Sequence, residues 1–197
     1  MTKIILASGS PRRRELLAMV GFDFEVMPAD VDETVDPGIP PNKLVVNLAI
    51  KKALHVRNKL KGDNAVVIGA DTVVAIDDLI LGKPKDEADA FDMLSRLQGR
   101  AHTVYTGVAV ASCVEDKMTT FVESTEVFMR PLGEKEIRWY MSTGEPFDKA
   151  GAYGIQEKGA VLIERVEGDY FTVVGLPLCR LNLTLGDFEN KRYLDRR

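Results

Sequence analysis

The sequence contains little cysteine and little histidine. It has two cysteines and two histidines among 197 residues. Cys113 and Cys179 stand in apolar surroundings without the spacing of a zinc or redox motif, which predicts reduced structural thiols. With only His55 and His102 to supply imidazole, a zinc site built from several histidines is disfavoured. Zinc-finger and histidine-based metal chemistry is therefore not expected.

Long apolar runs and an excess of positive charge are also missing. The first apolar run, residues 4–7, is too short for a signal-peptide core, and arginines follow it. No stretch approaches the length of a membrane span. The net charge of −4 gives no overall positive field that would attract nucleic acid, so any polyanion must meet a local cluster. We expect a cytoplasmic protein with neither membrane nor nucleic-acid partners.

Composition and patterning predict an α/β (α+β) fold. The chain is 45% hydrophobic and 28% charged, as in ordinary globular proteins, and its length suits one domain, residues 1–197. Apolar periodicity and turn residues predict these elements: strands at 3–7, 22–29, 65–76, 103–114, 118–129 and 160–166, and helices after Ser10, at 42–58, 86–98 and 133–144, and from Pro177. A Pro/Gly-rich loop is expected at 36–41 and a frayed end at 191–197. The expected sheet is mixed and partly antiparallel, with flanking helices.

The segment SGSPRRR (8–14) lies between the first predicted strand and the first helix. Its small residues offer hydroxyl and backbone N–H groups at a helix N-terminus, where anions bind. Arg12 and Arg13 follow in the first turn and could grip phosphate oxygens in a bidentate manner. The alternative is a capped helix with solvated arginines. Because arginine at a helix N-terminus opposes the macrodipole, the anion-site hypothesis is favoured.

Lys52 interrupts the apolar stripe of the predicted helix at 42–58. It lies three residues after Ala49 and four after Leu48, and therefore on the buried face. Its stem could pack while its amine reaches water. Alternatively, its ammonium lies at the floor of a cleft with an anionic partner. The pattern does not decide between these two interpretations.

Three further polar residues lie beside predicted strands. Asp71 interrupts the apolar strand GADTVV and is either a structural carboxylate or a general base. Glu33 lies in PADVDET and Lys83 in LGKPKD, both short loops. Carboxylates, hydroxyls and lysines together suit a polyphosphate with Mg²⁺, which takes one or two carboxylates and substrate oxygens. Asp30 and Asp32 are compatible with a solvated acidic loop.

The segment DKAGAYGIQEKGA (148–160) combines glycines with Tyr153 and Gln156. The glycines allow close backbone approach, and the glutamine amide can donate and accept together. That combination suits the adjacent N3–H and O4 of uracil or thymine. The alternative is a glycine-rich hairpin with an exposed glutamine, which this segment taken alone favours.

Taken together, these motifs resemble the Maf family of nucleoside triphosphate pyrophosphatases. The resemblance runs in order over nearly the whole chain, through these motifs: LASGSPRRRELL, VDET, the Lys52 helix, GADTVV, LGKP, HTVYTGVAV, DKAGAYGIQ and VVGLPL. It implies two lobes around a central cleft, as in Maf and ITPase-like folds. It also implies hydrolysis between the α- and β-phosphates with a divalent metal cation, Mg²⁺ or Mn²⁺.

The resemblance also implies roles for particular residues. Asp71 matches the proton acceptor that activates water, and Glu33 matches a residue near the metal. The phosphate-binding set corresponds to Ser8, Ser10, Arg13, Lys52 and Lys83. A homodimer is a further expectation from the family. Some members are linked to septum formation, so a non-catalytic nucleotide-binding regulator is the alternative from another class.

Three positions point to the branch of the family that acts on dTTP and UTP. That branch resembles this chain at Arg12, Thr72 and Gln156, where the branch similar to 7-methyl-GTP pyrophosphatases tends to carry Trp, Gln and Glu. Glu157 departs from a common glycine and could alter the edge of the base pocket, and Thr172 departs from a common asparagine. A purine or 7-methyl-GTP pyrophosphatase is the alternative among enzymes.

Overall fold

The structure is a computed structural model that describes residues 2–34, 38–77 and 79–189. The predicted loop at 36–41 lies partly outside these residues, and the segment 191–197 lies wholly outside them. The strands are β1 (Lys3–Leu6), β2 (Phe24–Val26), β3 (Ala65–Ile76), β4 (Leu79–Leu81), β5 (Ala101–Ser112), β6 (Met118–Met129) and β7 (Ile163–Glu167). The α-helices are α1 (Pro11–Met19), α2 (Pro41–Lys59), α3 (Glu87–Leu97), α4 (Glu134–Ser142), α5 (Tyr170–Val174) and α6 (Leu178–Glu189). Three 3-10 helices complete the order: η1 (Glu145–Asp148), η2 (Ala150–Ala152) and η3 (Glu157–Leu162).

The strands form one mixed sheet. Its order is β2-β1-β3-β5-β6-β7, and β4 pairs with β3 beside this path. β1 is parallel to both β2 and β3, whereas β4 and β7 are antiparallel to their neighbours. The predicted long segments become β5 and β6, which are neighbours in the sheet. The prediction of a mixed sheet flanked by helices is confirmed.

The chain divides into two compact units built from interleaved segments. Unit 1 comprises Met1–Asp71, Thr106–Glu123 and Gly175–Arg197, and unit 2 comprises Thr72–Tyr105 and Ser124–Val174. The strands β3, β5 and β6 each contribute residues to both units. The prediction of a single domain with a cleft between two lobes stays a prediction.

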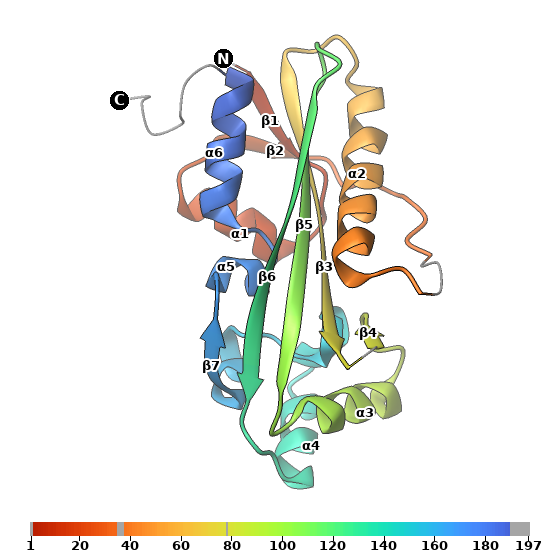
Figure 1. Cartoon of the computed structure of the whole chain (residues 1–197), viewed down its shortest axis with the longest axis vertical. Helices are drawn as coiled ribbons and strands as arrows, with labels where there is room; N and C mark the ends of the chain where they lie inside the picture. Colours follow the sequence, from red (N-terminus) through yellow and green to blue (C-terminus); the bar gives the residue numbers. More distant parts are fainter. Residues whose placement is uncertain (1, 35–37, 78, 190–197) are drawn as a thin grey trace. The chain divides into compact units, whose positions relative to one another are not determined.

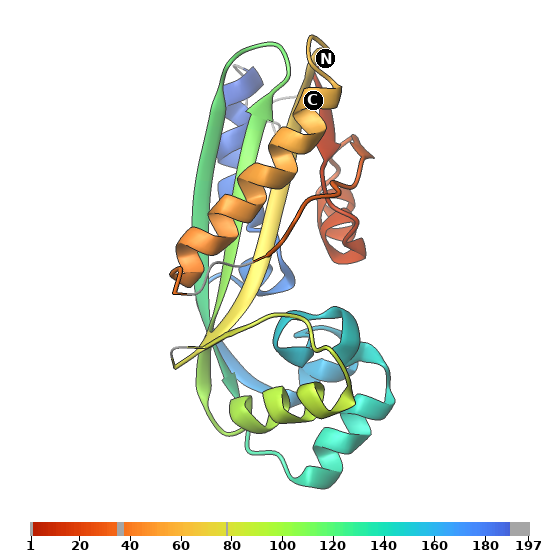
Figure 2. The same cartoon turned by 90° about the vertical axis from the view of Figure 1, so that its right-hand side faces the viewer.

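In unit 1, helices cover both faces of the sheet. α2 lies on one face, and α1 and α6 lie on the other (Figures 1 and 2). The contact of α2 with the strands is close because two strand residues have no side chain. A Cβ on Gly69 would lie 2.2 Å from the carbonyl oxygen of Ala49, and one on Gly107 would lie 2.5 Å from that of Val45. Helix backbone therefore rests directly on strand backbone at both glycines.

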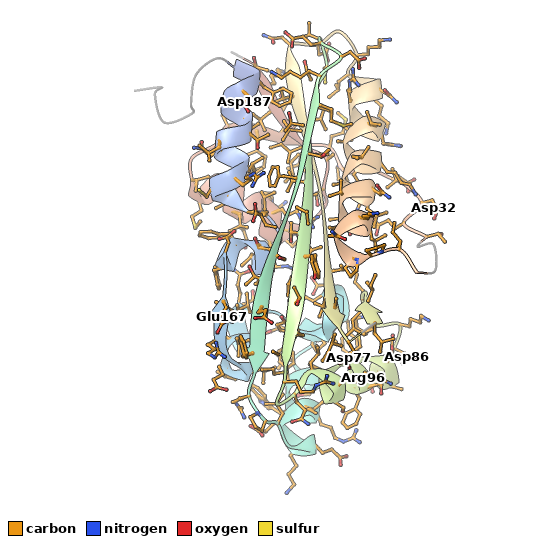
Figure 3. All side chains as sticks on the ribbon, in the orientation of Figure 1. Asp32, Asp77, Asp86, Arg96, Glu167 and Asp187 are labelled. Atoms are coloured by element: carbon orange, nitrogen blue, oxygen red, sulfur yellow. The ribbon has the colours of Figure 1, made fainter. Side chains whose placement is uncertain are left out.

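Unit 2 has a core of its own around α3 and α4, which contact each other beside the sheet (Figures 1 and 2). Asp86, labelled in Figure 3, caps α3 by accepting the N–H of Asp89 at 2.8 Å, as expected at that position. Tyr140, the largest fully buried side chain among the described residues, belongs to this core. Within the described ranges, no helix is both long and apolar enough to cross a membrane.

Several predicted elements differ from the structure. The strand expected at 22–29 is confined to β2, and Pro28, which has no N–H for the ladder, follows it. The strand expected at 160–166 begins only at Ile163, because 157–162 form η3. The hairpin alternative for 148–160 is wrong, since that segment contains helical turns. The helix α5 was not predicted.

Candidate active site

The close contact between α2 and β3 brings Lys52 onto Asp71. Gly69 and Asp71 are two residues apart in β3 and therefore face the same side of the strand, toward α2. Lys52 is the neighbour of Ala53, whose backbone nitrogen lies 2.7 Å from where a Gly69 Cβ would be. The missing side chain of Gly69 thus sets the short separation between Lys52 and Asp71.

Lys52 is paired with two carboxylates. Its Nζ lies 2.6 Å from Oδ1 of Asp71 and 2.8 Å from Oε1 of Glu33. Lys52 and Asp71 are each 8% exposed, so this ion pair is buried. The interpretation of Lys52 as a stem with its amine in water is therefore wrong. The carboxylate partners come from β3 and from the loop before α2.

Glu33 differs from the other acids of its loop. Asp32, labelled in Figure 3, and Asp30 are exposed, as expected for a solvated acidic loop. The side-chain hydroxyl and backbone N–H of Thr34 hydrogen-bond the Asp32 carboxyl and lower its pKa. The Glu33 side chain is 58% exposed yet contacts the buried Lys52. It therefore reaches from solvent to the buried pair.

The segment 8–14 forms a second polar cluster. Ser10 takes the N-cap position of α1, but its side chain makes no capping bond. The hydroxyl of Ser8 accepts hydrogen bonds from the Ser10 N–H at 3.3 Å and from Nη1 of Arg13 at 3.0 Å. Nε of Arg13 donates to the carbonyl of Gly175 at 2.8 Å. Arg13 is buried, so the alternative of solvated arginines is wrong for it. Arg14 is exposed, as that alternative expects.

Arg13 interacts electrostatically with the carboxylates that pair with Lys52, which relates the segment 8–14 to that ion pair. Burial lowers the pKa of Arg13, while the negative charges of Asp71 and Glu33 oppose that shift and the positive charge of Arg12 adds to it. Two cations and two carboxylates of unit 1 therefore act on one another. The backbone of α1 adds the positive end of its dipole at the same segment.

Three predicted residues lie in unit 2. Thr72 follows Asp71 in β3, and Lys83 is exposed just after β4. Gln156 is half-buried and directly precedes η3. The N–H of Gly151 donates to the carbonyl of Gly82 at 3.0 Å, so the loops that carry Lys83 and Gln156 are joined. Ser8, Ser10, Arg12, Arg13, Glu33, Lys52 and Asp71 belong to unit 1.

The donor set of unit 1 fits one kind of metal. Among the described residues, no group of three or more His, Cys, Asp or Glu could enclose an ion. Glu33 and Asp71 nevertheless converge on the same ammonium. Two carboxylates suit Mg²⁺ or Mn²⁺, which complete their coordination with substrate oxygens and water. Two carboxylates are too few for a metal whose ligands must all come from the protein.

The matching family model covers residues 3–188 and is described as Maf-like protein. This chain belongs to the Maf family. It is similar to the "dTTP/UTP pyrophosphatase" of Thermoanaerobacter sp. (strain X514), with 51% identity over 91% of this chain and 93% of that one. It is 51% identical to the protein of the same name from Acetivibrio thermocellus, over 95% and 96% of the two chains.

The chain is also similar to a further relative and to a solved structure. The "dTTP/UTP pyrophosphatase" of Bacillus mycoides is 48% identical over 96% of this chain and 97% of that one. The solved structure is the Ham1 protein of Staphylococcus aureus, with a TM-score of 0.46 and 16% identity over 82% of this chain and 79% of that one.

Some residues that build the site were missed by the sequence interpretation. Gly69 and Gly107 let α2 approach the sheet, and isolated glycines inside strands are a recognised signal of such an approach. Gly175 gives its carbonyl to Arg13 and has a φ of +119°, in a region that favours glycine. Its motif, VVGLPL, contributed to the resemblance, but its separation of 162 residues from Arg13 hid the contact.

Proposed function

We propose that this protein hydrolyses dTTP and UTP to the nucleoside monophosphate and pyrophosphate. The observation that carries the proposal is the buried Asp71, held by Lys52 at 2.6 Å within the electrostatic range of Arg13. The names of relatives that are about half identical over nearly the whole chain support the same reaction. A purely structural carboxylate would need no second acid on its lysine and no buried arginine that acts on it electrostatically.

Asp71 is the proton acceptor in this proposal. Its ion pair with Lys52 fixes the orientation of the carboxylate on β3, an element that other strands hold on both sides. Water attacks the α-phosphorus, Asp71 takes the water proton, and pyrophosphate leaves. General-base catalysis of this kind contributes about 10²–10⁴-fold to a rate.

The cations and amides of unit 1 hold the negative charge of the substrate. Ser8, Ser10 and Arg13 offer hydroxyl, N–H and guanidinium donors at the start of α1. Lys52 adds an ammonium, and we assign Lys83 of unit 2 to the same phosphate-binding set by its motif. Such fixed donors stabilise the charge that develops on the leaving group.

A divalent cation, Mg²⁺ or Mn²⁺, fits Glu33 and Asp71 as ligands. When bound, it would neutralise phosphate charge and polarise the phosphoryl group. The exposed Glu33 side chain can reach an ion that arrives with the substrate.

Arg12, Thr72 and Gln156 are assigned to substrate selection. The Gln156 amide can accept from N3–H and donate to O4 of uracil or thymine. No described residue hydrogen-bonds this amide, so it is available to a base. We extend the proposal to a homodimer in the cytoplasm, as expected for the family.

The test is pyrophosphate release from dTTP, UTP, CTP, GTP and 7-methyl-GTP with Mg²⁺ or Mn²⁺ and an EDTA control. Metal-dependent release confined to dTTP and UTP is expected. Release from guanine nucleotides would keep the reaction and overturn the assignment of the base-selecting residues. A folded protein that releases no pyrophosphate would favour the non-catalytic regulator instead.

A further inference from the structure

The loop 153–159, which carries Gln156, is anchored at its start by two buried side chains of unit 2. Tyr153 is buried, and its hydroxyl lies 2.7 Å from Nε2 of His102 in β5. The next residue, Gly154, donates its N–H to the hydroxyl oxygen of Tyr140 at 3.0 Å. Because Tyr140 is fully buried in the core of unit 2, this acceptor is fixed in place.

The end of the same loop is anchored by one carboxylate. Glu145, at the start of η1, accepts the N–H of Lys158 at 3.3 Å on Oε1 and that of Gly159 at 3.2 Å on Oε2. Successive N–H groups that converge on an anion form a nest, which a left-handed residue helps to shape. Glu157 has a φ of +54°, a conformation that a non-glycine residue keeps only when its surroundings hold it.

The start and the end of the loop also lie against each other. A Cβ on Gly159 would lie 2.1 Å from the carbonyl oxygen of Gly154 and 2.8 Å from the hydroxyl of Tyr140. Burial raises the pKa of the Tyr140 hydroxyl; the N–H of Gly154 opposes that shift, and the negative charge of the Glu145 carboxylate adds to it. The protonated hydroxyl can therefore donate to Glu145 while it accepts from Gly154. Tyr140 thus holds the start of the loop, and Glu145 holds its end.

Base selection by a glutamine depends on such a fixed setting. Uracil presents a donor at N3 and an acceptor at O4, whereas cytosine presents an acceptor at N3 and a donor at N4. A half-turn of the amide exchanges its oxygen and nitrogen and would suit cytosine equally. A glutamine therefore distinguishes the two bases only when its surroundings favour one orientation.

We propose that Tyr140 and Glu145 are positioning residues for base selection, because they hold the loop in which Gln156 stands. This inference rests on the proposed function and deepens it. Neither residue needs to contact the nucleotide. Their removal should therefore change which base is accepted more than it changes the rate of the chemical step.

The test uses Tyr140→Phe and Glu145→Gln in the full chain, with Tyr170→Phe and Glu134→Gln as exposed controls of the same unit. Phenylalanine removes the acceptor for Gly154, and glutamine turns an amide nitrogen toward one of the two N–H groups. Both variants should speed amide hydrogen exchange in the peptide 153–159. The ratio of kcat/KM for UTP to that for CTP should fall about tenfold, as expected for one lost hydrogen bond.

Most of that change should appear in KM, with kcat for UTP within about threefold of the wild type. Faster exchange with an unchanged UTP/CTP ratio would overturn the positioning role, and unchanged exchange would overturn the anchoring itself. If Tyr140→Phe does not fold, Glu145→Gln decides alone. A wild type that hydrolyses no nucleotide overturns the proposed function and the selection role with it, while hydrogen exchange still reports on the anchors.

Discussion

The two units of the molecule organise the polar groups around their predicted site residues in different ways. In unit 1, charged side chains pair directly with one another, and Lys52 lies within 2.8 Å of two carboxylates. In unit 2, the buried Tyr140 hydroxyl and the half-buried Glu145 carboxylate hold the backbone of a loop instead, and the His102 imidazole holds the side chain of Tyr153. The first arrangement suits chemistry that needs charge on rigid elements. The second suits recognition, which needs a loop with a defined shape.

The contrast between the two units fails most clearly if Asp71 is not a general base. Asp71→Asn keeps an oxygen that can accept from Lys52 but cannot take a proton. We expect kcat for dTTP to fall about 10³-fold, because general-base catalysis is lost. Pyrophosphate release measures the rate, and nucleotide binding by calorimetry serves as the control. Turnover within threefold of the wild type would remove this role from Asp71.

Gly69→Ala tests whether unit 1 depends on backbone contact between α2 and β3. The added Cβ would lie 2.2 Å from the carbonyl of Ala49, so helix and strand must separate. We expect a loss of about 3 kcal/mol in the free energy of unfolding, measured in urea, as for an overpacked core. Gly133→Ala is the matched control, because the nearest atom to its Cβ would be 3.8 Å away. Equal stability of the two variants would contradict the argument.

His102 tests whether a buried polar group of unit 2 is uncharged in the folded protein. Burial lowers the pKa of His102 to about 4 from 6.5, so the unfolded chain binds the proton more tightly than the folded one. The contribution of His102 to stability is complete above pH 6.5 and is lost as the pH falls to 4, by about 3 kcal/mol in total. Urea unfolding at pH 7, 5.5 and 4 should show a shallower decline for His102→Gln. Parallel curves for the two proteins would exclude this effect.

An exposed ion pair should matter least. Arg138 and Glu134 are one helical turn apart on α4, with Nη2 of Arg138 2.7 Å from Oε1 of Glu134. Both side chains are about two-thirds exposed, so solvent screens their attraction. Glu134→Gln should shift Tm by about 1 °C and leave kcat unchanged. A shift of more than 5 °C would show that surface pairs contribute to this fold as buried ones do.

Regular elements were predictable where a local pattern determines them. β3 was predicted with both ends correct, because its apolar run is bounded by polar residues. α2 was predicted to within one residue at each end, since its buried face repeats at helical spacing. The stripe placed Lys52 on the buried face but gave no information about its partners. Partners come from other elements, and only the packed structure identifies them.

The loop of unit 2 could not be predicted for a related reason. Tyr140 precedes Gly154 by 14 residues, and Glu145 precedes Gly159 by the same distance. No short pattern encodes a hydrogen bond across that separation. The glycines of 148–160 suggested a hairpin, whereas the nest around Glu145 turns the backbone into η3. Glu157, a departure from the expected glycine, occupies the left-handed position.

The hydrogen bond from Arg13 to Gly175 has a consequence for synthesis on the ribosome. Its two residues are 162 positions apart, so Arg13 emerges long before its acceptor exists. At roughly 5–20 residues per second, translation takes about 8–32 s to cover that distance. During this interval the guanidinium lacks the carbonyl that later orients it. A nascent chain should therefore become able to bind a nucleotide only after Gly175 has been translated.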